Sequence, residues 1–274
     1  MKNRKIVILG GDNRQRHLAE MLKNEFKEVN NINSGDEECA LSEISKADIL
    51  ILPIPVSKVK DLIYTDNSEF AISKKKVLQK IRRDTVIFGG GFTTEDKDFF
   101  EDAGYEYHDM LLNESFLLEN AYLTAEGAIR LLLENTEETL FNKKVLITGY
   151  GRIAEILSEM LLKFKLYVTV TARNEVQLKV AEKKGYHTID LKKLKSVKDF
   201  DFIFNTVPSR IFGGDMLLTD RKCTYFELAS APFGVDKNEL ISTGISFVQG
   251  ASLPGRFFTV TSAKLIAEYI LRFT

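Results

Sequence analysis

The sequence predicts an α/β protein made of two parallel-sheet domains that a long helix joins. Short apolar runs of strand length alternate with segments of helical period along the whole chain. Two of these runs, at residues 5–9 and 145–147, lead into paired glycines and then into a helical stripe. A helical pattern of more than five turns, residues 114–135, lies between them. Strands separated by helices favour parallel sheets, and 274 residues suffice for two cores.

The domain limits follow from these patterns. We expect residues 1–119 to form an N-terminal substrate domain, which residues 258–274 complete. We expect residues 120–257 to hold the bridging helix and the second domain. The C-terminal segment contains an amphipathic helix at 262–273, which is predicted to pack back on the N-terminal domain or on the bridge.

The second domain begins with the motif G-x-G-x-x-A. Gly149 permits a tight turn after the strand, Gly151 lets the backbone approach a pyrophosphate, and Ala154 lets the helix pack closely on the strand. The helix N-terminus, which includes Arg152 and Ile153, offers N–H groups and a partial positive charge to phosphates. The motif is common, so its context has to support it. It predicts a dinucleotide site on a Rossmann-like domain.

The next strand, residues 166–172, ends where such domains recognise the ribose. Sites that prefer NAD place Asp or Glu there, whereas this chain has Arg173, preceded by Thr171 and followed by Asn174. A guanidinium can bind a 2′-phosphate that a carboxylate would repel. We therefore expect NADP, with NAD as the weaker alternative. A plainer interpretation has Asn174 capping the next helix with Gln177, and Arg173 simply solvated. The two can coexist.

Four further strands, at 187–190, 202–207, 224–229 and 245–250, bring this domain to six. Their carboxyl ends are rich in small, polar and proline residues, and ligands of open parallel sheets bind at that edge. Prolines and glycines also end strands without any function. We expect cofactor contacts from Asn205, Thr206, Val207 and Pro208.

The N-terminal domain has strands predicted at 5–9, 47–53, 85–89 and 105–108. Its glycine turn, residues 10–14, reads Gly-Gly-Asp-Asn-Arg and lacks the later glycines of a dinucleotide site. The lysine-rich segment 57–83 is expected to be a solvated helix and loop. This domain is predicted to have the same topology as the second but to bind another ligand.

Composition excludes several classes of function. Lys plus Arg (38) nearly equals Asp plus Glu (39), so no basic field for nucleic acid is present. Cys39 and Cys223 form neither a disulfide framework nor a metal-ligand spacing, and suit a reducing cytoplasm. The apolar part of residues 6–9 is too short for a signal peptide, and no run is long enough for a bilayer. We expect a soluble cytoplasmic protein without a metal site, a nucleic-acid partner or a membrane partner.

Several phrases together resemble the A subunit of dipicolinate synthase, the oxidoreductase subunit of spore-forming bacteria. The most specific are residues 120–129 and 227–236, while the glycine motif and Asn-Thr-Val-Pro at 205–208 are generic to nicotinamide enzymes. Residues 10–14 and Leu-Pro-Gly at 253–255 also match. The chain departs from the family at Ala154, where glycine is more usual, and after Gly255.

The resemblance implies a nicotinamide-dependent enzyme, usually with NADP, that acts in sporulation with a separate flavoprotein-like B subunit of dipicolinate synthase. The enzyme that the resemblance implies converts a dihydrodipicolinate-type intermediate into dipicolinate. We also expect this chain to form a homo-oligomer. Removal of hydride makes the ring aromatic, so orientation matters more than strong acid–base groups. None of His17, His108 and His187 is therefore expected to be catalytic.

The substrate's two carboxylates need donors in a concave site. Arg14 is the leading candidate, with Asn120 and Thr124 of the bridging helix beside it. Asn120 and Thr124 could instead only bond to nearby backbone, and Arg14 could belong to an ordinary strand–helix connection. If a hydroxyl group leaves before oxidation, Asp12 or Glu227 could act as base, and nothing in the sequence decides between them.

Two rival functions remain open. One is another two-domain nicotinamide enzyme, of the 2-hydroxy-acid or alanine-dehydrogenase type. The other is a nucleotide-binding subunit without chemistry of its own, which would bind the cofactor but exchange no hydride.

Overall fold

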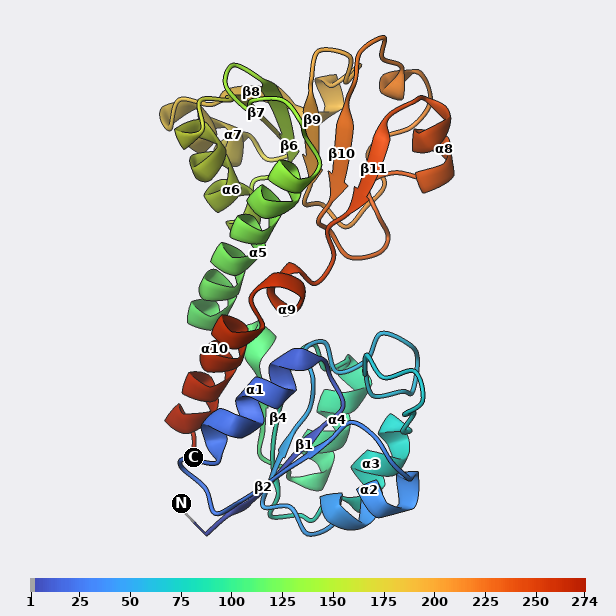
Figure 1. Ribbon diagram of the computed structural model, residues 1–274, viewed down its shortest axis with the longest axis vertical. Helices are drawn as coiled ribbons and strands as arrows, with labels where there is room; N and C mark the ends of the chain where they lie inside the picture. The colour runs from blue at the N-terminus through green and yellow to red at the C-terminus, as the bar shows by residue number, and fades with distance from the viewer. Residues whose placement is uncertain (1–2) are drawn as a thin grey trace. The chain divides into compact units, whose positions relative to one another are not determined.

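The computed structural model describes residues 3–274, which divide into two compact units (Figure 1). One unit holds the chain up to Asn120 together with Gly255–Thr274, and the other holds Ala121–Pro254. Each contains one parallel sheet with helices on it, which confirms the predicted fold class. The division falls within the long helix α5 (Glu114–Glu134).

The first unit has a five-stranded parallel sheet in the order β2-β1-β3-β4-β5. Its strands are β1 (Lys5–Leu9), β2 (Glu28–Ile32), β3 (Ile49–Ile51), β4 (Val86–Gly89) and β5 (Tyr107–Asp109). Sequence analysis predicted four of them and missed β2. That strand lies at the edge of the sheet and reads Glu-Val-Asn-Asn-Ile, so it has no apolar run to detect.

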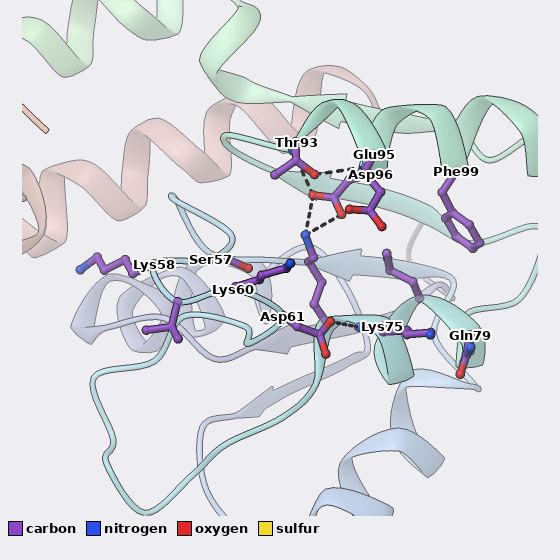
Figure 2. A pocket seen from close by; sticks show the side chains of 13 residues that line it. Ser57, Lys58, Lys60, Asp61, Lys75, Gln79, Thr93, Glu95, Asp96 and Phe99 are labelled. Carbon is purple, nitrogen blue, oxygen red and sulfur yellow. Dashed lines mark hydrogen bonds and ion pairs between the residues drawn. The ribbon is translucent and has the colours of Figure 1, made fainter. Parts of the chain in front are cut away.

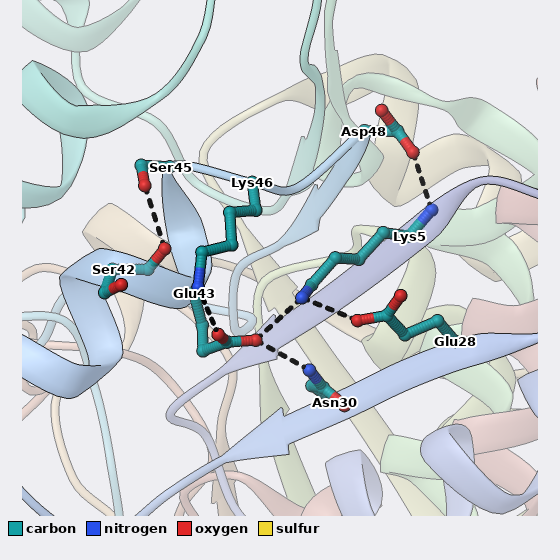
Figure 3. Close-up of polar contacts among 8 residues, drawn as sticks. All are labelled: Lys5, Glu28, Asn30, Ser42, Glu43, Ser45, Lys46 and Asp48. Atoms are coloured by element: carbon teal, nitrogen blue, oxygen red, sulfur yellow. Dashed lines mark hydrogen bonds and ion pairs between the residues drawn. The ribbon is translucent and has the colours of Figure 1, made fainter.

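Polar contacts explain how β2 is held without a buried apolar face (Figure 3). Lys5 Nζ lies 2.6 Å from Glu28 Oε1 and 2.8 Å from Glu43 Oε2, and Asn30 donates to the same Glu43 oxygen. Lys46 adds a second ammonium to Glu43. Glu43, which lies on α2 (Glu37–Ile44), thus connects this helix to β1 and β2.

Helices cover both faces of this sheet. Alternate residues of β1 point to opposite sides, so Ile6 and Ile8 pack with α1 (Asn13–Leu22) and α10 (Thr259–Arg272). Val7 and Leu9 pack with the opposite layer of α2 (Glu37–Ile44), α3 (Lys74–Lys80) and α4 (Thr94–Ala103). The predicted return of the C-terminal helix to the N-terminal domain is confirmed, because α10 lies against α1.

The second unit has a six-stranded parallel sheet in the order β11-β10-β9-β6-β7-β8, which confirms the predicted strand number. Its strands are β6 (Lys144–Thr148), β7 (Tyr167–Ala172), β8 (His187–Asp190), β9 (Phe202–Asn205), β10 (Thr224–Glu227) and β11 (Ser246–Gln249). Its helices are α6 (Arg152–Lys163), α7 (Glu175–Lys183) and α8 (Lys237–Ser242), and α9 (Leu253–Phe257) follows β11. No helix within residues 3–274 is long and apolar enough to cross a bilayer.

The contacts of Glu43 predict an acid-dependent loss of stability in the first unit. Hydrogen bonds from Lys5 and then Lys46 lower the pKa of Glu43 from 4.5 to about 2. The lowered pKa contributes stability that is complete above pH 4.5 and is lost as pH falls through about 2.

Glu43→Gln should therefore be less stable than the unmodified chain at pH 7, with a gap that narrows steadily below pH 4.5. Urea unfolding at a series of pH values measures this gap. The exposed Glu38 on the same helix provides the matched control, Glu38→Gln. A gap that stays constant down to pH 2 would contradict the assignment.

Candidate functional site

Both sheets have a point where the strand order reverses, and open parallel sheets bind ligands there, outside the carboxyl ends of the strands. In the first unit this switch point lies between β1 and β3, and in the second between β6 and β9. The glycine turns after β1 and β6 therefore lie at the two positions where the topology favours a ligand.

The turn after β6 depends on Gly149. Its φ is +85°, a conformation that side chains disfavour. A Cβ atom there would lie 2.8 Å from both Thr206 Oγ1 and Val207 Cγ2. The missing side chain thus lets the end of β6 lie directly against the segment that follows β9, and Gln177 Nε2 donates to Tyr150 O beside it.

The start of α6 fits a phosphate group. Gly151 is the N-cap residue, it supplies no side-chain cap, and nothing lies within 4 Å of the position of a Cβ. The twelve-residue helix begins at Arg152, with Ile153 next, so its first N–H groups follow this open position. Ala154 is fully buried and meets the need for a small residue where the helix packs on the sheet. These residues fit a dinucleotide.

At the end of β7 the three predicted residues differ in exposure. Arg173 is exposed and has no hydrogen bond or ion pair within residues 3–274. Asn174 accepts from Val176 N and caps α7, as the plainer interpretation expected. Thr171 is fully buried, its carbonyl accepts from Gly149 N at 2.7 Å, and its hydroxyl has no hydrogen-bond partner in the described part of the chain. Arg173 and Asn174 are thus both exposed at this strand end, whereas Thr171 is buried.

The residues predicted after β9 also differ in their exposure to solvent. Thr206 and Val207 are half-buried beside Gly149, and Pro208 is exposed. Thr206 Oγ1 donates to Thr148 O at 2.6 Å, which joins β6 and β9 at the switch point. Asn205 is fully buried, so it lies beneath the surface that a cofactor would touch.

Asn205 belongs to a buried polar network around Glu227. The Glu227 carboxylate accepts from Asn205 Nδ2 (2.6 Å), Tyr225 OH (3.0 Å), Ala229 N (3.1 Å) and Gly234 N (2.9 Å). Thr148 Oγ1 completes the chain with a bond to Asn205 Oδ1 at 2.5 Å. Burial raises the pKa of Glu227, and the hydrogen bonds, that from Asn205 first, oppose the rise.

This network gives Glu227 a role that its sequence position did not show. Glu227 was a candidate base. The structure shows that it is fully buried and that each of its two carboxylate oxygens accepts two hydrogen bonds. Such a carboxylate is well placed to hold the segment from Ala229 to Gly234 over the sheet edge. Sequence analysis missed Tyr225 and Thr148, although Tyr225 shares a strand face with Glu227 two residues later.

In the first unit, Arg14 and Asp12 form a pair at the β1/β3 switch point. Arg14 Nε and Nη2 donate to the two oxygens of Asp12, both at 2.8 Å, and Nη2 also donates to Ile54 O just after β3. Asp12 caps α1 in a capping box with Gln15. Asp12 thus orients the guanidinium, and Nη1 has no hydrogen bond within residues 3–274.

Gly255 closes over this pair. A Cβ atom at Gly255 would lie 2.8 Å from Asp12 Oδ2 and 3.0 Å from Arg14 Nε. Asn120 and Thr124 lie on α5 on either side of the division between the units. Asn120 is half-buried, Thr124 is buried, and each already interacts within the chain.

His108 lies among aromatic side chains of the first unit. His108 stacks on Phe88, with ring centroids 4.7 Å apart, and lies 4.6 Å from the ring of Phe273. Its Nε2 faces Glu106 at 3.2 Å. His108 therefore packs β5 against α10.

The Glu227 network predicts the effect of Glu227→Gln. The amide places an NH₂ group opposite a backbone N–H, that of Ala229 or Gly234, which then loses its acceptor at a cost of about 1–3 kcal/mol. Hydrogen exchange of residues 228–234 should accelerate accordingly, while that of β7 stays unchanged.

Glu182→Gln, an exposed carboxylate of the same unit, is the control. Unchanged exchange at residues 228–234 in Glu227→Gln would show that the carboxylate does not hold this segment.

Comparison with known proteins gives matches over nearly the whole chain. The family model for the N-terminal domain of the dipicolinate synthase A subunit matches residues 5–111. The dipicolinate synthase A subunit of Bacillus subtilis (strain 168) is 26% identical over 281 aligned residues, which cover 97% of this chain and 94% of that protein.

Solved structures agree in fold. The crystal structure of the dipicolinate synthase A subunit from Bacillus halodurans has a TM-score of 0.83 at 20% identity, and covers 100% of this chain and 98% of that one. The apo structure of D-lactate dehydrogenase from Escherichia coli has a TM-score of 0.69 at 12% identity, and covers 98% and 95%. The matches confirm the resemblance of this chain, along nearly its whole length, to the A subunit of dipicolinate synthase.

Proposed function

We propose that this chain is the oxidoreductase subunit of a dipicolinate synthase, which oxidises a dihydrodipicolinate-type dicarboxylate to dipicolinate with NADP. The observation that carries the proposal is the pair of glycine turns at the two switch points. One leads to an open helix N-terminus at Gly151, and the other to an oriented guanidinium at Arg14. The similarity to the dipicolinate synthase A subunit supports the choice of substrate.

The second unit would hold the nicotinamide cofactor, which accepts a hydride from the substrate. The N–H groups of Arg152 and Ile153 would bind the pyrophosphate, and Gly151 leaves room for it. Arg173 would bind the 2′-phosphate, because it is exposed and has no partner within residues 3–274. Asn174, Thr206, Val207 and Pro208 would line the site, and the buried Thr171 and Asn205 would support it from beneath.

In the first unit, Arg14 would bind one ring carboxylate through Nη1. Asp12 already takes Nε and Nη2, so the guanidinium plane is fixed before the substrate arrives. We assign Asp12 this orienting role, and we assign Asn120 and Thr124 to the same substrate. Aromatisation provides the driving force, so the proposal needs no strong base, and Glu227 acts through the loop that it holds.

The partner and setting follow from the same proposal. A flavoprotein-like B subunit of dipicolinate synthase would assemble with this chain in the cytoplasm during sporulation, and the chain itself would form a homo-oligomer. The relatives are named as one subunit of a synthase, which supports the existence of a partner.

The proposal is tested by mixing the purified chain, NADP, dihydrodipicolinate synthase and that enzyme's substrates, with and without the flavoprotein-like partner. Dipicolinate is measured by its absorbance. Dipicolinate formation that requires this chain is expected. No dipicolinate in either mixture, or turnover of a 2-keto acid instead, would overturn the proposed substrate.

Arg173→Asp should weaken NADP binding at least about tenfold, since it removes charge-assisted hydrogen bonds worth about 1.5–3 kcal/mol each, and should change NAD binding little. Calorimetric titration with both nucleotides measures the difference. Lys179→Asp, an exposed cation on α7, is the control with the same charge change. Equal losses for NADP and NAD would mean that Arg173 does not read the 2′-phosphate.

Arg14→Lys should raise KM for the dicarboxylate about 10-fold to 100-fold, because an ammonium cannot keep both the Asp12 pair and the substrate contact. The dissociation constant of NADP should not change. Arg16→Lys, an exposed arginine of the same helix, should leave both values unaltered. A KM for Arg14→Lys equal to that of Arg16→Lys would remove Arg14 from the substrate site.

A further inference from the structure

The first unit contains a hollow that is separate from the Arg14 pair and is not used by the proposed reaction. It lies between the loop at residues 57–61, helix α3 and the start of α4 (Figure 2), and has a volume of about 890 Å³. Pockets for small molecules have volumes of roughly 300–1,000 Å³. The hollow is thus large enough for a metabolite.

Its walls carry more positive charge than their own carboxylates neutralise. Lys74 forms an ion pair with Asp96, in which Nζ lies 2.7 Å from Oδ1. This ion pair is largely shielded from water. Asp61 accepts from Lys75 N and from Ser73 Oγ. Asp96 is thus neutralised by Lys74, whereas Asp61 is exposed and has hydrogen bonds but no ion pair within residues 3–274.

Two ammonium groups then remain without a carboxylate partner. Neither Lys60 nor Lys75 forms an ion pair within residues 3–274, and they come from opposite walls, the loop and α3. Lys58 is directed away, over the ring of Tyr64 at 3.5 Å. The opposing charges in the lining are Glu95 of α4 and Asp61, neither of which forms an ion pair within residues 3–274.

The rest of the lining combines apolar side chains with the uncharged polar residues Ser57, Gln79 and Thr93. Val59, Leu78 and Phe99 face the hollow, and Val59 is 62% exposed. The hydroxyl of Ser57 is buried and has no hydrogen-bond partner within residues 3–274. A buried hydroxyl without a partner is uncommon and indicates a missing one.

We propose that this hollow binds a small organic anion with an apolar body. Its anionic group would lie between Lys60 and Lys75, within reach of the Ser57 hydroxyl, and its body would pack on Val59, Leu78 and Phe99. Ser57 lies three residues after Ile54, whose carbonyl accepts from Arg14. One loop therefore touches both this hollow and the Arg14 pair.

The test uses the full chain and the aromatic sulfonate dye 1-anilinonaphthalene-8-sulfonate, whose fluorescence rises in apolar surroundings. The dye should bind with one site per chain. The double variant Lys60→Gln/Lys75→Gln should bind it at least about tenfold more weakly, because charge-assisted contacts are lost. The control Lys27→Gln/Lys192→Gln removes two exposed lysines elsewhere and should bind the dye as the unmodified chain does.

A second probe tests the charge requirement. The uncharged analogue N-phenyl-1-naphthylamine should bind the unmodified chain at least about tenfold more weakly than the sulfonate. Equal dye affinity in the two double variants would place the dye elsewhere and overturn the proposal. So would an absence of dye binding, or equal binding of the uncharged analogue.

Discussion

The close approach of two chain segments at Gly149 is the constraint on which the second unit depends. A left-handed turn without a side chain lets the end of β6 meet Thr206 and Val207, which follow β9. The strand order of the sheet reverses between β6 and β9, and α6 begins directly after the glycine turn at this switch point. Any side chain at Gly149 would force these segments apart and move the helix N-terminus with them. Backbone geometry, more than the identity of exposed side chains, therefore creates the candidate phosphate site.

The same edge contains an unusual amount of buried polarity. A buried carboxylate is costly unless every oxygen has donors, and Glu227 has four. The donors come from β9, from β10 and from the segment between Ala229 and Gly234, so the charge joins parts that apolar contacts alone would leave free to shift. In the first unit, the carboxylate of Asp12 likewise fixes the orientation of the Arg14 guanidinium. Both carboxylates fix the direction of other groups, which is the property that a reaction driven by aromatisation would need most.

Sequence periodicity was sufficient for most of the architecture and for little of the site. Apolar runs revealed β1, β3, β4 and most strands of the second sheet, because burial of a strand requires such runs. Strand β2 was missed because its sequence has only two apolar residues, Val29 and Ile32, and polar contacts of Asn30 and Glu28 help to hold it.

The segment 57–83 was expected to be solvated, yet Ile63, Phe70 and Val77 lie in the core, and the segment lines a hollow. Widely spaced apolar residues in a lysine-rich loop give no periodic signal. The sequence also did not show which of the candidate site residues are buried. Asn205, Thr171 and Glu227 were selected by their places at strand ends, but a strand end does not determine which way a side chain points.

A crystal structure of the chain with NADP and dipicolinate tests the central claim most directly. The account predicts the pyrophosphate on the first N–H groups of α6, the 2′-phosphate beside Arg173 and a ring carboxylate on Arg14. A dinucleotide bound away from Gly151, or a diacid held by neither Arg14 nor its neighbours, would contradict it.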